Sequence, residues 1–262
     1  MLRIDKATAP LVEVFCSIQG EGIHVGRRQI FVRTFGCNLS CDYCDTLAAL
    51  RTPHSALRIG EWSVFSPEGE ISSHPNPATV DEVIAAVREL ERISGPHHSA
   101  SITGGEPLLH PRFVADLARG LGEIGLPVHL ETNATLPEAL AEVLPHVDVV
   151  AADVKLKSAA GENVPLSLHR EFLSLITQAG KEVFVKMIVT EGTDLNEVEA
   201  AAEMVAEVNA GIPLVIQPAT AVPGKPHLTP TGASLAEMQR VCLRHLRDVR
   251  VIPQCHKILG VR

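Results

Sequence analysis

Three cysteines lie close together near one end of this 262-residue chain. Cys37, Cys41 and Cys44 follow the spacing C-x3-C-x2-C, and Tyr43 directly precedes the last of them. Three thiolates on one loop can ligate three irons of a cubane [4Fe–4S] cluster, which leaves the fourth iron open to a substrate or cofactor. The alternatives are unrelated cysteines or a zinc site with His54 as a further ligand. Zinc usually takes four ligands, often as two distant pairs, so the spacing favours the cluster.

Composition narrows the class of protein. The net charge of −8 argues against nucleic-acid binding, which needs a basic surface. No apolar run is long enough to cross a bilayer, so we expect no membrane association. The first 15 residues lack the apolar core of a signal peptide, and we expect a cytoplasmic protein. Outside the triplet, Cys16, Cys242 and Cys255 are expected to be buried free thiols, because a second cluster would need more ligands.

Short apolar segments alternate with helical patterns from about residue 80 onward, which predicts parallel βαβ units in one α/β domain spanning 1–262. Candidate functional residues fall just past the expected strand ends, where (β/α) barrels build their sites. We therefore predict an incomplete (β/α) barrel of about six parallel strands. The expected strands are 12–15, 29–33, 100–103, 128–131, 147–152, 183–189, 214–216 and 249–252. The expected helices are 80–93 (with Thr79 as N-cap), 112–121, 168–179, 195–208 and 234–246.

The stretch 47–78 interrupts this pattern. It contains several Pro, Gly and Ser residues and the one tryptophan of the chain. We predict a loop-rich insertion after the cysteine loop, with a short hairpin around 62–65. It is either a lid over the site or a surface embellishment.

The cysteine triplet resembles the signature of the radical S-adenosylmethionine (SAM) superfamily. In that superfamily the open iron binds the amino and carboxylate groups of SAM, and the reduced cluster cleaves SAM to a 5′-deoxyadenosyl radical. Upstream, residues 15–22 read F-C-S-I-Q-G-E-G, and the side chains of Gln19 and Glu21 could read a pterin or purine edge. This run resembles the N-terminal motif of the 7-carboxy-7-deazaguanine synthases. The resemblance covers the chain apart from 47–78.

The resemblance implies a set of SAM contacts. Thr103-Gly104-Gly105-Glu106-Pro107 is similar to the superfamily's G-G-E-P motif, which contacts the SAM amino group. Polar residues after three later strands match positions that line the SAM pocket. The implied SAM-binding residues are Tyr43, Cys44, Asp45, Gly105, Glu106, Asn133, Asp153, Lys155 and Gln217.

The resemblance also implies the substrate and Mg²⁺ contacts. Arg33 would hold a substrate carboxylate, for which a planar two-pronged donor is well suited, although it could also be a surface arginine. Thr46, in the run Cys44-Asp45-Thr46, would ligate Mg²⁺ through its hydroxyl, and a helix N-cap is the structural alternative. The implied substrate-binding residues are Ile18, Gln19, Gly20, Glu21, Arg33, Thr103 and His256, the last in the run 252–257, I-P-Q-C-H-K.

The implied reaction converts 6-carboxy-5,6,7,8-tetrahydropterin to 7-carboxy-7-deazaguanine with loss of ammonia. The cluster, SAM and Mg²⁺ are the implied cofactors, and no side chain is assigned a catalytic role beyond the cluster and SAM. A flavodoxin- or ferredoxin-like electron donor and a homodimer are also implied. Two alternatives stay within the superfamily: a paralogue with another pterin- or purine-like substrate, and a glycyl-radical-enzyme activase. The run Gln19–Gly22 and Arg33 argue against the activase. A structural cluster- or zinc-bearing module is the non-enzymatic alternative.

Overall fold

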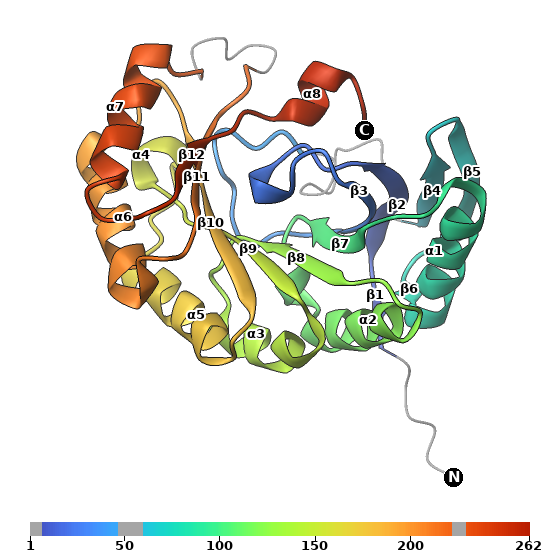
Figure 1. The fold of residues 1–262 in the computed structure, drawn as a ribbon. Helices are drawn as coiled ribbons and strands as arrows, with labels where there is room; N and C mark the ends of the chain where they lie inside the picture. The colour runs from blue at the N-terminus through green and yellow to red at the C-terminus, as the bar shows by residue number, and fades with distance from the viewer. Residues whose placement is uncertain (1–6, 47–59, 222–228) are drawn as a thin grey trace.

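One large curved sheet organises the computed structural model, which describes residues 7–46, 60–221 and 229–262 (Figure 1). Within these residues the sheet has ten strands in the order β12-β11-β10-β9-β8-β7-β3-β2-β4-β5. A separate two-stranded sheet pairs β1 (Thr8–Ala9) with β6 (Ala78–Thr79). The strands of the large sheet are β2 (Leu11–Ile18), β3 (Arg28–Thr34), β4 (Glu61–Ser66), β5 (Gly69–Pro75), β7 (Ser99–Gly104), β8 (Val128–Thr132), β9 (Val149–Asp153), β10 (Glu182–Val189), β11 (Leu214–Pro218) and β12 (Val249–Val251).

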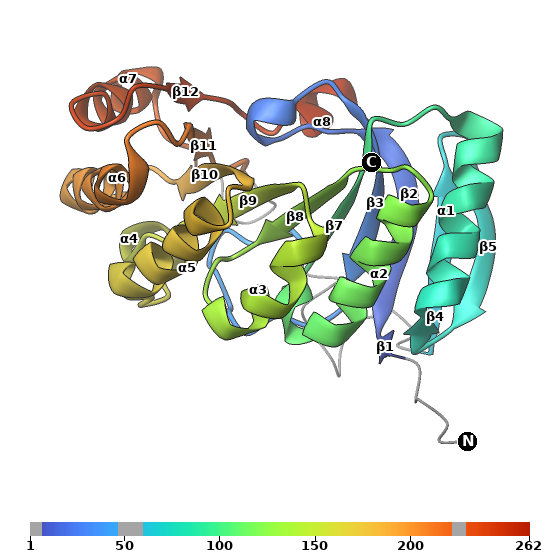
Figure 2. The ribbon, with the colours of Figure 1, turned by 60° about the horizontal axis from the view of Figure 1, so that its bottom comes forward.

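The parallel part of this sheet confirms the predicted α/β partial barrel. Among the described strands, β3 and β7 to β12 are parallel to one another, seven strands where about six were expected. Helices connect these strands and cover the outer face of the curved sheet (Figure 2). The helices are α1 (Val80–Ser94), α2 (Pro111–Glu123), α3 (Pro137–Val143), α4 (Lys157–Ala160), α5 (Leu166–Gln178), α6 (Leu195–Asn209), α7 (Gly232–Cys242) and α8 (Cys255–Leu259).

The strands are mostly apolar because helices bury one face of the sheet and the barrel interior encloses much of the other. Polar residues interrupt these strands at a few interior positions. Glu131 on β8, Asp153 on β9 and Lys186 on β10 line an interior cavity. A charged side chain in a buried strand requires a partner, so these positions mark the interior as a functional surface.

The connection between β2 and β3 turns into the barrel interior. β2 is antiparallel to β3, and the loop between them contains the 3₁₀ turn Gly22–His24. The ring of His24 lies 5.3 Å from that of His129 on β8 and 6.1 Å from that of Phe184 on β10. Figure 1 shows this loop inside the curve of the sheet, so the loop occupies part of the interior of the partial barrel.

The expected insertion extends the sheet where the structure describes it. Residues 47–59 and the alternative zinc ligand His54 lie outside the described residues. The hairpin expected around 62–65 is confirmed as β4 and β5, and β4 pairs with β2. Trp62 is buried at this edge. Among the described residues, none of 60–78 lines the interior cavity, so the lid hypothesis now concerns 47–59.

Local signals set the boundaries of the outer helices. Thr79 is the N-cap of α1, as expected, and forms a capping box with Glu82. In the part of the chain that the structure describes, no helix is long and apolar enough to span a membrane.

Candidate active site

A cavity of about 560 Å³ opens at the carboxyl ends of the parallel strands. It brings together segments far apart in the chain: the loop after β2, the cysteine loop after β3, the ends of β7 to β11 and the C-terminal segment. Its lining includes every residue predicted to bind the cluster, SAM, Mg²⁺ or substrate, with the exception of Glu106. The roles of these residues remain predictions. Those roles require the residues to lie around one cavity, and in the structure they do.

The cysteine loop is held against the G-G-E-P turn that follows β7. The backbone N–H of Glu106 donates to the carbonyl of Gly36 at 2.7 Å, and that of Gly105 donates to the carbonyl of Thr34 at 3.3 Å. A Cβ on Gly105 would lie 2.0 Å from the Gly36 oxygen and 3.1 Å from Cys37 Cβ. Glycine is therefore required at 105 because the two loops touch backbone to backbone.

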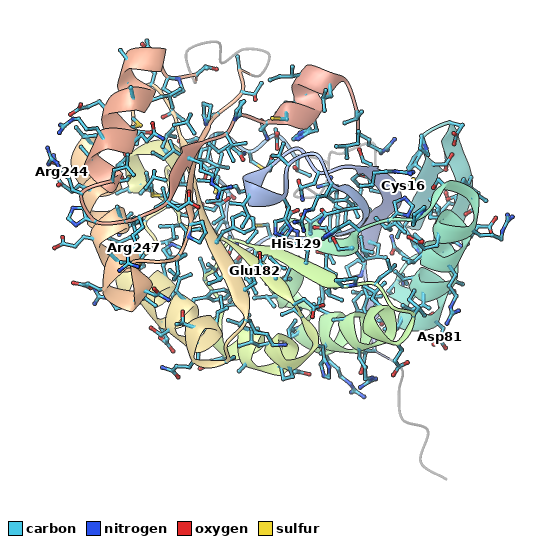
Figure 3. The ribbon with its side chains drawn as sticks, in the orientation of Figure 1. Cys16, Asp81, His129, Glu182, Arg244 and Arg247 are labelled. Atoms are coloured by element: carbon cyan, nitrogen blue, oxygen red, sulfur yellow. The ribbon has the colours of Figure 1, made fainter. Side chains whose placement is uncertain are left out.

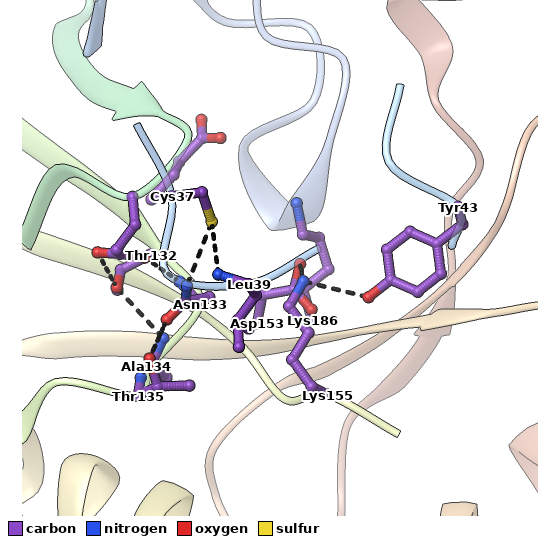
Figure 4. Close-up of polar contacts among 12 residues, drawn as sticks. Cys37, Leu39, Tyr43, Thr132, Asn133, Ala134, Thr135, Asp153, Lys155 and Lys186 are labelled. Carbon is purple, nitrogen blue, oxygen red and sulfur yellow. Dashed lines mark hydrogen bonds and ion pairs between the residues drawn. The ribbon is translucent and has the colours of Figure 1, made fainter. Parts of the chain in front are cut away.

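Cys37 lies within a small hydrogen-bonded group (Figure 4). Its Sγ accepts from the backbone N–H of Leu39 at 3.4 Å and from Asn133 Nδ2 at 3.8 Å. Asn133 Nδ2 also donates to Asn38 Oδ1 at 2.8 Å. These donors favour a thiolate at Cys37 and orient it toward the cavity.

Burial raises the pKa of each of the three thiols, Cys37, Cys41 and Cys44. The thiols are half-buried, and a metal that binds them must displace their protons. Among the described residues, no group of three or more His, Cys, Asp or Glu side chains is placed so that it could hold a single metal ion.

Glu106 lies beneath the cavity wall and is fully buried. Its carboxylate accepts from Leu108 N at 2.9 Å, from Thr132 Oγ1 at 2.8 Å and from Asn133 N at 2.7 Å. Burial raises the pKa of Glu106 to about 6, against the opposing effect of these donors. The carboxylate ties the G-G-E-P turn to the end of β8, and a direct contact with the SAM amino group stays a prediction.

Tyr43, Asp153 and Lys155 form a second polar group (Figure 4). Lys155 Nζ donates to Asp153 Oδ2 at 2.9 Å and to Tyr43 Oη at 3.1 Å. Burial opposes the charge on Lys155, but Asp153 holds its pKa well above the usual range. Asp153 Oδ1 and Gln217 Oε1 are buried and accept no hydrogen bond from the described residues. Two buried acceptors without donors in a cavity wall suit a ligand that carries N–H or O–H groups.

The floor of the cavity is a charged network built on the predicted substrate motif. Gln19 Nε2 donates to Glu131 Oε1 at 2.9 Å, and Thr103 Oγ1 donates to Glu131 Oε2 at 3.2 Å. Glu21 pairs with Lys186 at 2.5 Å. Burial alone would raise the pKa of Glu21, but Lys186 outweighs it and lowers the pKa to about 2. Glu21 is therefore ionised, with Lys186 as its counterion.

Arg33 lines the cavity and lies beside Glu13 and Arg262. Its Nε donates to Glu13 Oε1 at 2.9 Å, and Arg262 donates to Glu13 Oε2 at 2.7 and 2.9 Å. The ring of Phe15 lies 5.4 Å from the Arg33 guanidinium and 5.8 Å from that of Arg262. The guanidiniums of Arg33 and Arg262 share the one carboxylate of Glu13. The side chains of these three residues therefore carry a net positive charge, which suits an anionic ligand.

Asp45 and Thr46 line the cavity beside the cysteines. Thr46 Oγ1 donates to Asp45 Oδ1 at 3.1 Å. Lys257 lies 2.5 Å from Asp45 Oδ2 and Gln254 Nε2 lies 3.0 Å from the same oxygen. Burial would raise the pKa of Asp45, but these donors lower it to about 2. Hard oxygen atoms beside the cysteine loop are the donors that Mg²⁺ prefers.

Sequence reasoning missed several charged or polar residues that line the cavity, among them Glu13, Lys186, Gln254, Lys257 and Arg262. Lys186 carried a usable signal, because a lysine in the apolar run E-V-F-V-K-M-I-V of β10 must have a buried partner. Gln254 and Lys257 flank the predicted His256. Glu13 and Arg262 carried no local signal.

The cysteines outside the triplet lie away from the cavity lining. Cys16 is buried on β2, and its Sγ lies 3.2 Å from Ser94 Oγ at the end of α1 (Figure 3). Cys242 is also buried, as expected, whereas Cys255 is half-buried.

Comparisons with known proteins relate the whole chain to one family. A family model described as "Radical SAM superfamily" matches residues 31–205. The 7-carboxy-7-deazaguanine synthase of Geobacter sulfurreducens is 40% identical over 98% of this chain and 99% of its own length. That of Methanothermobacter thermautotrophicus is 35% identical over 97% of this chain and 98% of its own length. Among solved structures, QueE from Escherichia coli has a TM-score of 0.61 at 21% identity, with 95% of each chain covered, which supports the fold.

Proposed function

Since the chain belongs to the radical SAM superfamily and, within it, to the 7-carboxy-7-deazaguanine synthase family, we propose that it converts 6-carboxy-5,6,7,8-tetrahydropterin to 7-carboxy-7-deazaguanine with loss of ammonia, in an Mg²⁺-dependent reaction. Membership of the superfamily implies a [4Fe–4S] cluster and SAM. One observation carries the choice of substrate. The cavity that contains the three cysteines is also lined by Gln19 and Glu21 of the N-terminal motif and by Arg33 and Arg262.

The residues present fit the two superfamily cofactors. Cys37, Cys41 and Cys44 would hold the cluster, and the backbone contact between Gly36 and Gly105 fixes the loop that carries them. The unpaired acceptors Asp153 Oδ1 and Gln217 Oε1 would accept hydrogen bonds from SAM. When bound, the cluster and SAM supply the radical that removes a hydrogen atom from the substrate.

The protein's own contribution is binding and orientation. Glu21 is ionised and would accept hydrogen bonds from the N–H groups of the pterin, while Gln19 is fixed by Glu131 and presents its amide oxygen to the backbone of Glu21. Arg33 would hold the substrate carboxylate. A ring held through both its N–H groups and its carboxylate would have a fixed orientation in the cavity, and positioning of this kind lowers the barrier by removing rotational freedom.

Mg²⁺ fits beside the cysteine loop. Thr46 would be its protein ligand, with substrate oxygens completing the coordination, because Mg²⁺ keeps many ligands from water or substrate. The ion would act as a template that orients the ring. The proposed electron donor is a flavodoxin- or ferredoxin-like protein and the proposed assembly is a homodimer, both on the family resemblance.

One anaerobic assay tests the proposal. The protein is loaded with its cluster and given 6-carboxytetrahydropterin, SAM, Mg²⁺ and a strong reductant, and mass spectrometry measures 7-carboxy-7-deazaguanine. Product formation is the expected result. Formation of 5′-deoxyadenosine without that product would refute the substrate and favour a paralogue with another pterin- or purine-like substrate. If cluster-loaded protein forms neither 7-carboxy-7-deazaguanine nor 5′-deoxyadenosine, the proposed enzyme activity is refuted.

A further inference from the structure

The C-terminal segment crosses from β12 to the opposite side of the partial barrel. The backbone N–H of Cys255 donates to the carbonyl of Gly20 at 2.8 Å. A Cβ on Gly20 would lie 2.4 Å from the backbone nitrogen and from Nδ1 of His256, so the segment packs directly on the N-terminal motif. Figure 1 shows α8 in the opening between the two ends of the curved sheet. This contact delivers Gln254 into the cavity.

Gln254 is buried, with 9% of its surface exposed, and its amide group is fully used. Its Nε2 donates to Glu21 Oε1 at 2.8 Å and to Asp45 Oδ2 at 3.0 Å. Its Oε1 accepts from Thr220 Oγ1 at 2.6 Å. An amide NH₂ has two donors, and here each reaches a different carboxylate. The opposite amide orientation would put oxygen against two carboxylates, so the network determines which end is nitrogen.

The two carboxylates belong to different parts of the site. Glu21 is in the motif predicted to read the substrate, and Asp45 precedes Thr46, the proposed Mg²⁺ ligand. Each also has its own lysine: Lys186 lies 2.5 Å from Glu21 Oε2, and Lys257 lies 2.5 Å from Asp45 Oδ2, the oxygen that Gln254 also contacts. The carboxylates of Glu21 and Asp45 therefore face the same nitrogen, Gln254 Nε2. Without the two N–H donors of Gln254, these like charges would repel each other and move apart.

We infer that Gln254 is a positioning residue that fixes Glu21 and Asp45 relative to each other, and so couples substrate recognition to the Mg²⁺ loop. This inference rests on the proposed function. Gln254 acts through the two carboxylates and contacts neither reacting atoms nor the cysteines among the interactions described. Its loss should therefore weaken substrate and Mg²⁺ binding together, while the cluster and the SAM contacts stay in place.

Two substitutions separate the effect of the donors from that of the volume. Q254E keeps the size and the bond from Thr220 but replaces two donors with a third carboxylate. Q254M keeps the length, removes both donors and adds no charge. Q178E, at an exposed position near the end of α5, is the matched control for the added charge.

The experiment uses cluster-loaded protein with SAM. Fluorescence of the unreactive analogue 6-carboxypterin measures equilibrium binding with and without Mg²⁺, and initial rates with 6-carboxytetrahydropterin give KM and the half-saturating Mg²⁺ concentration. Iron content, thermal midpoint and 5′-deoxyadenosine formed without substrate report the fold, the cluster and the SAM site. We expect Q254E to raise the analogue's Kd and the half-saturating Mg²⁺ concentration each about tenfold or more, since two charge-assisted hydrogen bonds are lost. Q254M should raise both by less, and Q178E should match the parent.

The outcomes distinguish the inference from the function it rests on. If the parent protein makes no 7-carboxy-7-deazaguanine, the proposed function fails whatever the variants do. If the parent makes it and Q254E binds the analogue and Mg²⁺ like Q178E, the positioning role is refuted. A shift of one affinity without the other would also refute the coupling. If both Gln254 variants have less iron or a lower thermal midpoint than the parent, Gln254 has a structural role instead.

Discussion

Replacing Lys186 with methionine should expose the energetic importance of the buried pair beneath the cavity. Lys186 and Glu21 lie 2.5 Å apart, and their side chains are 11% and 17% exposed. Burial alone would raise the pKa of Glu21, yet the lysine and its other partners lower it from 4.5 to about 2. That difference corresponds to about 3 kcal/mol in favour of the charged form, at about 1.4 kcal/mol per pKa unit. Methionine fills the same space but leaves Glu21 as a buried carboxyl without a counterion, a change that typically costs about 3–5 kcal/mol.

The assay is urea unfolding of the cluster-free protein under anaerobic, reducing conditions. We expect K186M to lower the free energy of unfolding by about 3 kcal/mol at pH 7. Because the folded pKa of Glu21 is depressed, its stabilising contribution is present above pH 4.5 and is lost as the pH falls toward 2. The difference between parent and K186M should therefore shrink on acidification through this range. K157M, at an exposed position on α4, is the control and should change little.

A double variant decides whether the charge is the cause. E21Q/K186M removes both charges, so it should recover most of the stability that K186M loses. If E21Q/K186M is as unstable as K186M, or if K186M unfolds like K157M, the pair does not stabilise the fold as argued. A difference that grows as the pH falls would contradict the sign of the linkage.

Three further changes test the cysteine loop and the Mg²⁺ position. Gly105→Ala should lower the free energy of unfolding by about 3 kcal/mol or more and reduce iron per chain, because the new Cβ would lie 2.0 Å from the Gly36 oxygen. Gly122→Ala, where a Cβ meets no atom within 4 Å, is the control. Full iron content in the Gly105 variant would contradict the argument. Cys41→Ala should abolish both iron binding and product formation, whereas Cys255→Ala should retain the iron; an active Cys41 variant would rule out the cluster assignment. Thr46→Ala should keep its iron but need more Mg²⁺ for half-maximal rate, and an unchanged Mg²⁺ titration would remove Thr46 as a ligand.

Much of the fold followed from periodicity. The strands of the parallel sheet were predicted because each is a short apolar run between helical patterns, and Val149–Asp153 and Glu182–Val189 fall at the expected places. α1 was predicted closely, since Thr79 caps it and its apolar face is regular. α3 was missed because seven residues that begin at Pro137 are too short to show a period. Helix α7 ends at Cys242, four residues before the expected end, and the chain continues in turns whose backbone N–H groups donate to the carbonyls of Val241 and Cys242.

The site was less predictable than the fold, for a physical reason. Residues such as Cys37 and Gly105 lie in motifs whose spacing reflects local geometry, which a sequence displays directly. Glu13, Gln254 and Arg262 act through partners that lie 20 to 249 positions away in the chain, so no local pattern identifies them. Glu106 lies in a motif that the sequence displays, but the orientation of its side chain could not be predicted. Its carboxylate accepts hydrogen bonds from backbone N–H groups beneath the cavity, and only the packed structure determines this orientation.

The balance of charge around the cavity explains how an acidic protein can hold an anionic substrate. The chain as a whole carries a net charge of −8. Among the described residues that line the cavity, five carboxylates (Glu13, Glu21, Asp45, Glu131 and Asp153) face five cations (Arg33, Lys155, Lys186, Lys257 and Arg262), so their formal charges cancel. The cations are not spread evenly, because two arginines share one glutamate where a carboxylate is expected. The field inside the cavity thus differs from the field of the whole surface, and the local imbalance would orient the proposed anionic substrate. Removal of Arg33 or Arg262 would leave these charged side chains with a net negative charge, and this should weaken the binding of a carboxylate more than the binding of SAM, whose sulfonium and amino charges offset its own carboxylate.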